Sequence, residues 1–215
     1  MNASTERLML AGPVGAIEAL RDAPAAGAAP QGVAVIAHPH PLFGGTMDNK
    51  VVQTLARAFV QCGWTAVRFN FRGVGATAGQ HDAGISETED LLAVLAQLGG
   101  EAAAPAALAG FSFGAFVTSR ALAAVHAARR IEQLVLVGTA ASRFAVQPVP
   151  AELHERTLVV HGEQDDTVPL DSVMDWARPQ SLPVTVVPGG GHFFHGQLPL
   201  LKGLVVRHLR ARASA

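Results

Sequence analysis

Short apolar runs of strand length alternate with amphipathic helical patterns along most of this chain. The run at 33–37 is unbroken and apolar, as in parallel strands that are covered on both faces. The next pattern, at 48–61, has apolar residues at helical spacing and is followed by Gly63, a residue that favours a helix end. This alternation predicts the α/β class, with a mostly parallel central sheet and helices on both faces.

The other expected elements follow in chain order. A hairpin is expected at 6–10 and 16–20, followed by a loop at 22–32 that is rich in alanine, proline and glycine. The expected strands are 65–71, 106–110, 131–137, 157–160 and 184–187, and the expected helices are 87–98, 113–128 and 198–211.

The composition sets limits on the partners. The 215 residues suit one extended core, and 49% of them are hydrophobic, enough for a sheet buried on both faces. The 16 Lys and Arg residues nearly balance the 17 Asp and Glu residues, which leaves no electrostatic footprint for nucleic acid or an anionic membrane. We therefore expect a small-molecule partner that is uncharged or is not selected by charge, and no nucleic acid or membrane.

Cysteine usage and the N-terminal sequence indicate the compartment. Cys62 is the only cysteine, so no intramolecular disulfide can form. Residues 1–10 lack a basic run followed by an unbroken apolar core, and a proline and two glycines interrupt the charge-free stretch 102–119. These features predict a soluble, cytoplasmic protein and leave its oligomeric state open.

A serine lies where an expected strand meets an expected helix, in Gly110-Phe111-Ser112-Phe113-Gly114. A nucleophilic serine needs a sharp turn that lifts its hydroxyl above the sheet, and small residues two positions before and after let the strand and helix backbones pass. In a chain with 22 glycines such spacing can arise by chance. The strand–turn–helix context is what favours Ser112 as a nucleophile.

A serine hydroxyl needs a base to take its proton and an acid to orient that base. Asp165 and Asp166 follow the expected strand 157–160, and His192 follows a glycine run after the strand 184–187. These loops share the carboxyl edge of the sheet with Ser112, where ligands bind in such folds. His195 is a weaker rival for the base, and His161 fits a core histidine better than a catalyst.

Two backbone N–H groups must also face the developing oxyanion. The residue after the nucleophile, Phe113, supplies one, and the loop after the strand 33–37 should supply the other. Prolines have no N–H, so His40 and Leu42 are the nearest donors in that loop, with His40 favoured.

A metal site is the alternative use of the histidines. The set that can be drawn for zinc consists of His38, His40, His161, Asp165 and His192. That interpretation leaves the serine turn unexplained, so we expect no metal.

Four segments together resemble the α/β-hydrolase superfamily, and more narrowly its small, capless bacterial members related to dienelactone hydrolase. They are His38-Pro-His-Pro-Leu-Phe-Gly-Gly-Thr-Met-Asp-Asn-Lys50, Phe69-Asn-Phe-Arg-Gly-Val-Gly75, Gly110-Phe-Ser-Phe-Gly114 and Gly189-Gly-Gly-His-Phe-Phe-His-Gly196.

The resemblance selects among the open candidates. The superfamily pattern Gly-x-x-Asp-x-x-Val-Pro places the acid at Asp165, and the glycine-rich turn places the base at His192. Many relatives carry Asp at Asn70 and Ser at Thr77, residues that hold a turn. Dienelactone hydrolases use a cysteine where Ser112 stands, so their substrate is not carried over.

Relatives with a lid insert it after the strand that corresponds to 131–137. Only about twenty residues, 138–156, follow that strand here, so the resemblance implies the α/β-hydrolase fold without a lid domain, a single domain over 1–215 and an open site. The expected pocket residues are Leu42, Phe43, Phe113, Phe193, Phe194 and His195. At least one of the four phenylalanines is expected to be an ordinary core residue.

The expected function is a serine hydrolase that cleaves small ester-type substrates through an acyl-enzyme, without a metal or organic cofactor. Thioesterases, peptidases and acyltransferases use the same triad and stay open as alternatives. A non-catalytic binding protein on this fold is the alternative from another class.

Overall fold

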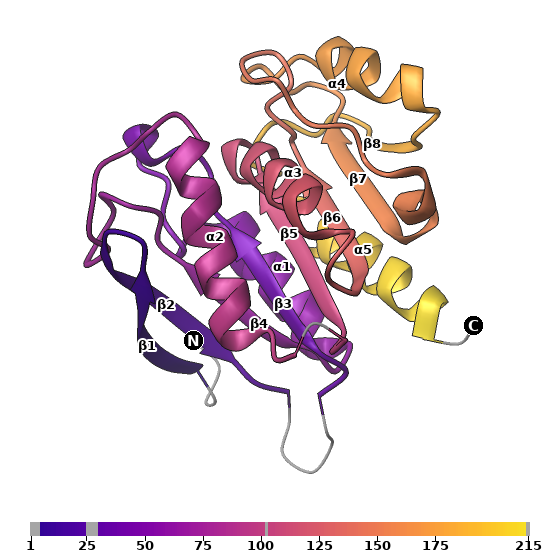
Figure 1. Cartoon of the computed structure of the whole chain (residues 1–215). Helices are drawn as coiled ribbons and strands as arrows, with labels where there is room; N and C mark the ends of the chain where they lie inside the picture. Colours follow the sequence, from indigo (N-terminus) through magenta and orange to yellow (C-terminus); the bar gives the residue numbers. More distant parts are fainter. Residues whose placement is uncertain (1–4, 25–29, 102, 214–215) are drawn as a thin grey trace.

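The computed structural model describes residues 5–24, 30–101 and 103–213 (Figure 1). One sheet carries eight strands in the order β1-β2-β4-β3-β5-β6-β7-β8. Their bounds are β1 Thr5–Gly12, β2 Gly15–Asp22, β3 Val33–Ala37, β4 Thr65–Phe69, β5 Ala106–Phe111, β6 Ile131–Val137, β7 Thr157–Gly162 and β8 Val184–Val187. The hairpin β1–β2 joins β4 in antiparallel register, and every pairing from β4 to β8 is parallel. The predicted mostly parallel sheet is confirmed.

Helices cover both faces of this sheet (Figure 1). They are α1 Lys50–Gln61, α2 Ile85–Leu98, α3 Phe113–Val125, α4 Leu170–Ala177 and α5 Leu198–Ala213, with 3-10 turns η1 Pro41–Phe43, η2 Ala151–Arg156 and η3 Arg178–Gln180. Buried side chains of α1 and α5 form one apolar core against the sheet, and those of α2, α3 and α4 form a second core on the opposite face.

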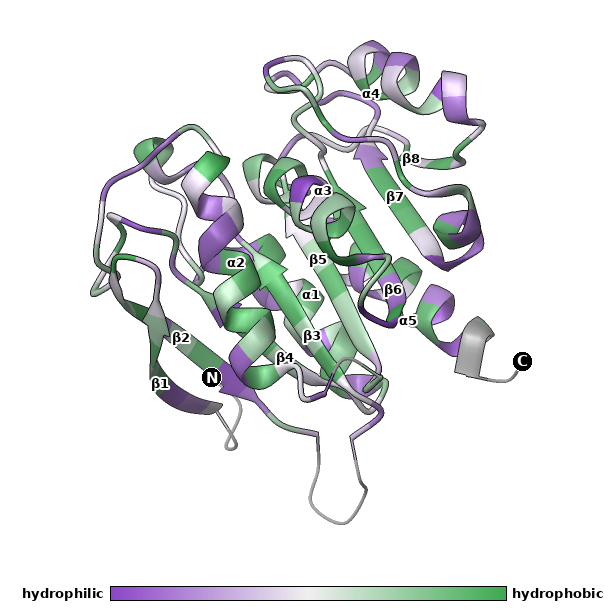
Figure 2. Cartoon of the chain, viewed as in Figure 1, coloured by the Kyte–Doolittle hydropathy of each residue, from purple (hydrophilic) through white to green (hydrophobic). Residues whose placement is uncertain are grey.

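The central strands are apolar on both sides, as Figure 2 shows for β3 and β5. All six residues of β5 are buried, and four of them are alanine or glycine, which leaves space for helices on each face. Larger residues such as Val35 and Leu108 are also fully buried, and each contributes about 1.5–3 kcal/mol by leaving water. Burial on both faces is what requires the unbroken apolar runs of the sequence.

The helix boundaries differ slightly from the prediction because polar residues set them. The helix expected at 48–61 begins at Lys50, since the Asn49 side chain accepts the Val51 and Val52 N–H groups as an N-cap. The helix expected at 87–98 begins two residues earlier, where the Glu87 side chain accepts the Gly84 N–H.

The remaining differences lie at the ends of strands and in one missed helix. The strand expected at 65–71 ends at Phe69, and the helix expected at 113–128 ends at Val125. Helix α4 was not predicted, because it is short and buries only Val173 and Ala177. Within the loop expected at 22–32, Asp22 belongs to β2, and residues 25–29 lie outside the described part of the chain. Two other predictions also include residues outside the described part. These are residues 1–4 of the N-terminal segment and residue 102 of the charge-free stretch 102–119.

The segment between β6 and β7 holds only a loop and the turn η2, so no lid domain is inserted there. Within the described ranges, no helix combines the length and apolar character needed to cross a bilayer.

Candidate active site

Ser112 occupies a strained turn between β5 and α3. Its backbone has φ 57° and ψ −118°, a region that residues other than glycine rarely adopt. A Cβ on Gly110 would lie 2.3 Å from the Gly114 carbonyl oxygen, and one on Gly114 would lie 2.4 Å from the Ala37 oxygen. Glycine is therefore required at both positions, as the turn motif predicts.

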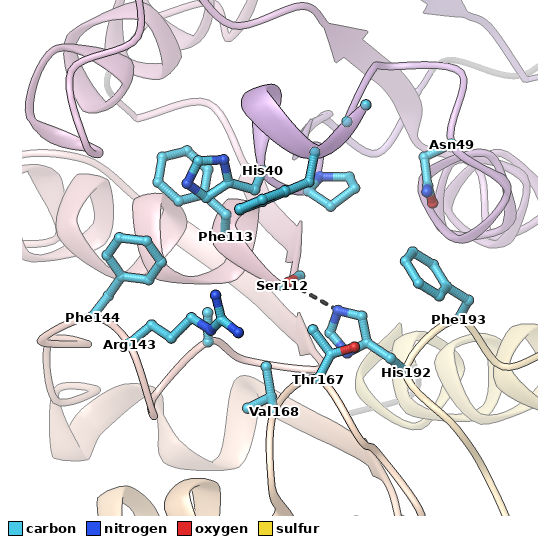
Figure 3. A pocket seen from close by; sticks show the side chains of 15 residues that line it. His40, Asn49, Ser112, Phe113, Arg143, Phe144, Thr167, Val168, His192 and Phe193 are labelled. Atoms are coloured by element: carbon cyan, nitrogen blue, oxygen red, sulfur yellow. Dashed lines mark hydrogen bonds between the residues drawn. The ribbon is translucent and has the colours of Figure 1, made fainter.

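Ser112, His192 and Asp165 form one hydrogen-bonded chain. The His192 Nε2 atom lies 3.0 Å from Ser112 Oγ, and its Nδ1 atom lies 2.7 Å from Asp165 Oδ2 (Figure 3 draws the first bond). All three residues are buried. The geometry matches a base that faces a hydroxyl and is oriented by a carboxylate.

Asp165 is held in its ionised form. Its Oδ1 accepts the Val168 N–H at 2.7 Å and the Thr167 N–H at 3.0 Å. Burial raises the pKa of this carboxyl, but the hydrogen bonds from the His192 side chain and the Val168 N–H hold it below its usual range. Asp166, the other acid left open by the residues, is exposed and lies against the Thr167 hydroxyl.

Close backbone packing fixes the His192 loop beside the sheet. A Cβ on Gly162, at the end of β7, would lie 2.3 Å from the Gly190 oxygen. Gly138 has φ +54°, and a Cβ there would lie 3.3 Å from the His192 ring. The Phe111 ring packs on His192 with centroids 4.9 Å apart. The imidazole is therefore confined on the side away from the solvent.

His161 lies directly behind the acid and faces the core. Its Nε2 donates to the Val168 carbonyl at 2.9 Å and lies 3.4 Å from Asp165 Oδ2. Burial lowers the pKa of His161, so the ring is neutral. This placement agrees with the interpretation of His161 as a core histidine.

His38 uses both ring nitrogens within the protein. Nδ1 donates to the Pro39 carbonyl at 2.6 Å, and Nε2 accepts the Phe71 N–H at 3.0 Å. Burial lowers the pKa of His38 to about 4. In the described part of the chain, no group of three or more His, Cys, Asp or Glu side chains has an arrangement that could hold a metal ion.

Asn70 and Thr77, the two residues that differ from many relatives, stabilise a turn through polar contacts. The Asn70 side chain accepts the Met47 N–H at 2.9 Å and donates to Glu18 at 2.9 Å. The Thr77 hydroxyl donates to the Asn70 carbonyl at 2.9 Å. Neither residue lines the cavity beside Ser112.

A cavity of about 320 Å³ opens beside Ser112. Figure 3 shows the side chains around it. They are Pro39, His40, Phe43, Gly44, Gly45, Asn49, Ser112, Phe113, Ala140, Arg143, Phe144, Thr167, Val168, His192 and Phe193.

The cavity includes some of the expected pocket residues and not others. Phe43, Phe113 and Phe193 line it. Phe194 does not, because its φ of +52° turns the ring into the core, where it is fully buried. Leu42 is 70% exposed and His195 is exposed, and neither lines the cavity.

Arg143 and Phe144 line the cavity and were not predicted. Both lie in the connection between β6 and β7, which carries no motif. The only sequence signal for these two pocket residues was an arginine next to a phenylalanine in the connection where relatives with a lid carry their insertion.

The backbone N–H groups expected to face an oxyanion are those of Phe113 and of His40 or Leu42. Phe113 is the first residue of α3, where backbone N–H groups lack partners within the helix. In the other loop, the Leu42 N–H already donates to His40 Nδ1 at 3.2 Å, which favours the His40 N–H.

Comparisons with known proteins place the chain in a family, although no family model matches it. A lidless α/β serine hydrolase from Xanthomonas campestris is 38% identical, with a TM-score of 0.84 over 98% of this chain and 96% of that one. An α/β serine hydrolase homologue from Coxiella burnetii is also 38% identical, with a TM-score of 0.78 over 95% and 97%. An uncharacterized protein of Rickettsia prowazekii is 31% identical over 75% of this chain and 71% of its own length. With this fold and these similarities, the chain belongs to the α/β hydrolases, among their small members without a lid.

Proposed function

We propose that this hydrolase cleaves small carboxylic esters through a covalent acyl-enzyme on Ser112. The observation that carries the proposal is the hydrogen-bonded chain from Ser112 through His192 to a buried, ionised Asp165, at the wall of an open cavity.

Each residue has a defined task in this reaction. His192 takes the Ser112 proton as Oγ attacks the ester carbonyl, and the N–H groups of Phe113 and His40 stabilise the oxyanion. His192 then gives that proton to the leaving alcohol. A water molecule, deprotonated by His192, attacks the acyl-enzyme, releases the acid and restores Ser112. Asp165 holds the imidazole with Nε2 facing the serine and stabilises its charged form.

The cavity favours small substrates with apolar parts. Its walls include four phenylalanine rings, and no lid covers it. A volume of about 320 Å³ is at the lower end of the range for small-molecule sites. Carboxylic esters combine a polarised carbonyl with apolar groups, which suits this lining.

Hydrolysis of short p-nitrophenyl esters tests the proposal. Wild type should turn them over, and Ser112→Ala should reduce kcat to the background rate. Ser142→Ala removes an exposed serine that does not line the cavity, and it should retain wild-type kinetics. Turnover that survives in Ser112→Ala would refute the assignment, and binding without turnover in wild type would favour a non-catalytic protein.

A further inference from the structure

The cavity beside Ser112 carries one permanent charge, and that charge is positive. Arg143 lines it, and none of the described lining residues is aspartate or glutamate. Its other polar members are amide, hydroxyl and imidazole groups, none of which carries a permanent charge. The net charge of the chain is close to zero, but the candidate active site has a local positive charge.

The backbone that carries Arg143 is held in place. The neighbouring Phe144 stacks on Phe116 of α3, with ring centroids 4.6 Å apart and planes 15° apart. Phe144 also meets Phe113 edge-on at 5.3 Å. Beyond this pair, the Gln147 N–H donates to the Ser119 hydroxyl at 3.0 Å. The segment is therefore a packed wall of the cavity, and it fixes where the Arg143 side chain starts.

Arg143 has no acidic partner of its own among the described residues, in contrast to Arg68 and Arg72. Arg68 pairs with Asp22 at 3.1 Å, and Arg72 pairs with Asp90 at 2.7 Å. Arg143 is exposed and forms no ion pair within the described ranges. Its guanidinium is free to bind an anion that enters the cavity.

The charge of Arg143 acts inside the site. Burial lowers the pKa of the His40 imidazole, and the nearby His81 lowers it further. Glu87 raises this pKa, and the positive charge of Arg143 lowers it. His40 also packs on Phe113, with centroids 4.8 Å apart. Arg143 therefore lies within electrostatic range of the oxyanion side of the cavity.

The position of Arg143 indicates which part of a substrate it faces. In Figure 3 its guanidinium points into the cavity on the side of Ser112 that lies away from His192. The leaving alcohol must lie next to His192 to receive its proton. An acyl chain that extends away from His192 would pass Phe144 and Val168, which line the cavity together with Arg143.

We propose that Arg143 binds an anionic group at the far end of the acyl chain, so that the preferred substrates are half-esters of dicarboxylic acids. This inference rests on the proposed esterase function and adds a substrate class to it. A carboxylate would form charge-assisted hydrogen bonds with the guanidinium, and the apolar walls would cover the methylene groups between the two ends.

Matched esters test the inference. Ethyl hydrogen succinate, glutarate and adipate are compared with neutral ethyl esters of equal acyl length, and acid release is followed by titration. Ethyl acetate is compared with acetoxyacetate, which carries its anion on the alcohol side. The readout is the ratio of kcat/KM for the anionic ester to that for its neutral partner.

Wild type should favour at least one half-ester over its neutral partner. Arg143→Gln should lower the ratio of the two kcat/KM values by about 10- to 100-fold, the range expected for a hydrogen bond to a charged group. Arg143→Lys keeps the charge and should retain part of the preference, whereas Arg143→Glu should bring the ratio below that of Arg143→Gln. Added salt should reduce the wild-type ratio. Arg57→Gln, which removes an exposed arginine of α1 outside the cavity, should leave the ratio at the wild-type value.

Several results would overturn the inference. One is a wild-type kcat/KM that is no higher for any half-ester than for its neutral partner. Another is a preference for half-esters that persists in Arg143→Gln. A third is a preference for acetoxyacetate alone among the anionic esters. If neutral esters are hydrolysed through Ser112 in any of these cases, the proposed function stands and only the role of Arg143 fails. If no ester is hydrolysed and a fluorophosphonate does not label Ser112, both fail.

Discussion

His38 should make the fold sensitive to mild acid. Its Nε2 accepts the Phe71 N–H and its Nδ1 donates to Pro39, so the neutral ring satisfies both bonds. Protonation of Nε2 would remove the acceptor and leave a charge in a fully buried position. A fall in pH should therefore destabilise wild type more than His38→Gln, which lacks the titrating group.

The direction and size of this pH effect on stability follow from the pKa of His38, which is lowered to about 4 from 6.5 for an ordinary histidine. Between these values the unfolded chain binds the proton and the folded protein does not, so stability is present above about pH 6.5 and is lost as the pH falls toward 4. The full difference corresponds to about 3 kcal/mol. From about pH 7 to pH 5, the loss attributable to His38 is about 2 kcal/mol.

Urea unfolding at several pH values measures this effect. His38→Gln should be less stable than wild type at neutral pH, because the fit of the ring is lost. That stability gap should narrow by about 2 kcal/mol on acidification to about pH 5, because only wild type loses the contribution of the histidine. Val35→Ala, in the strand β3 that ends just before His38, should show a stability gap that does not change with pH, since it removes packing without a titrating group.

If the stability difference between wild type and His38→Gln stays constant from neutral pH to pH 5, the proposed effect of protonating His38 is wrong. A widening gap would refute it as well, because it would mean that the protonated ring stabilises the fold.

The remaining predictions concern the candidate active site. Asp165→Asn should lower kcat by about 10⁴-fold with little change in the circular dichroism spectrum, whereas Asp166→Asn should stay near the wild-type rate, and equal losses would argue against the assignment of Asp165. Gly114→Ala should destabilise by about 3 kcal/mol or more in urea unfolding, since its Cβ would lie 2.4 Å from the Ala37 oxygen. Gly203→Ala in α5, where a Cβ meets nothing within 4 Å, should instead raise the free energy of unfolding by about 0.5–1 kcal/mol.

The sequence predicted those parts of the site that depend on topology. A parallel sheet brings the carboxyl ends of its strands to one edge, so Ser112 after β5 and His192 after β8 lie close together whatever the details of the loops. The choice between Asp165 and Asp166 needed the family pattern. Two adjacent acids in a loop differ only in backbone conformation, which spacing does not encode.

The side chains that shape the cavity could not be predicted in the same way. Phe193 and Phe194 are neighbours with the same chemistry, yet the positive φ at Phe194 sends one ring into the core and leaves the other at the cavity. Arg143 reaches the cavity because Phe144 stacks on Phe116, a contact between residues 28 positions apart. Such contacts between distant segments follow from the packed fold, not from local pattern.

Covalent labelling is the most direct test of whether Ser112 is a nucleophile activated by His192. The protein is treated with a fluorophosphonate, and intact mass and peptide mapping locate the adduct. We predict one adduct, on Ser112, with a labelling rate that falls by about a thousandfold in His192→Ala and is unchanged in His195→Ala. An adduct on another residue, or equal labelling of Ser112 without His192, would contradict the assignment of Ser112 as a nucleophile activated by His192.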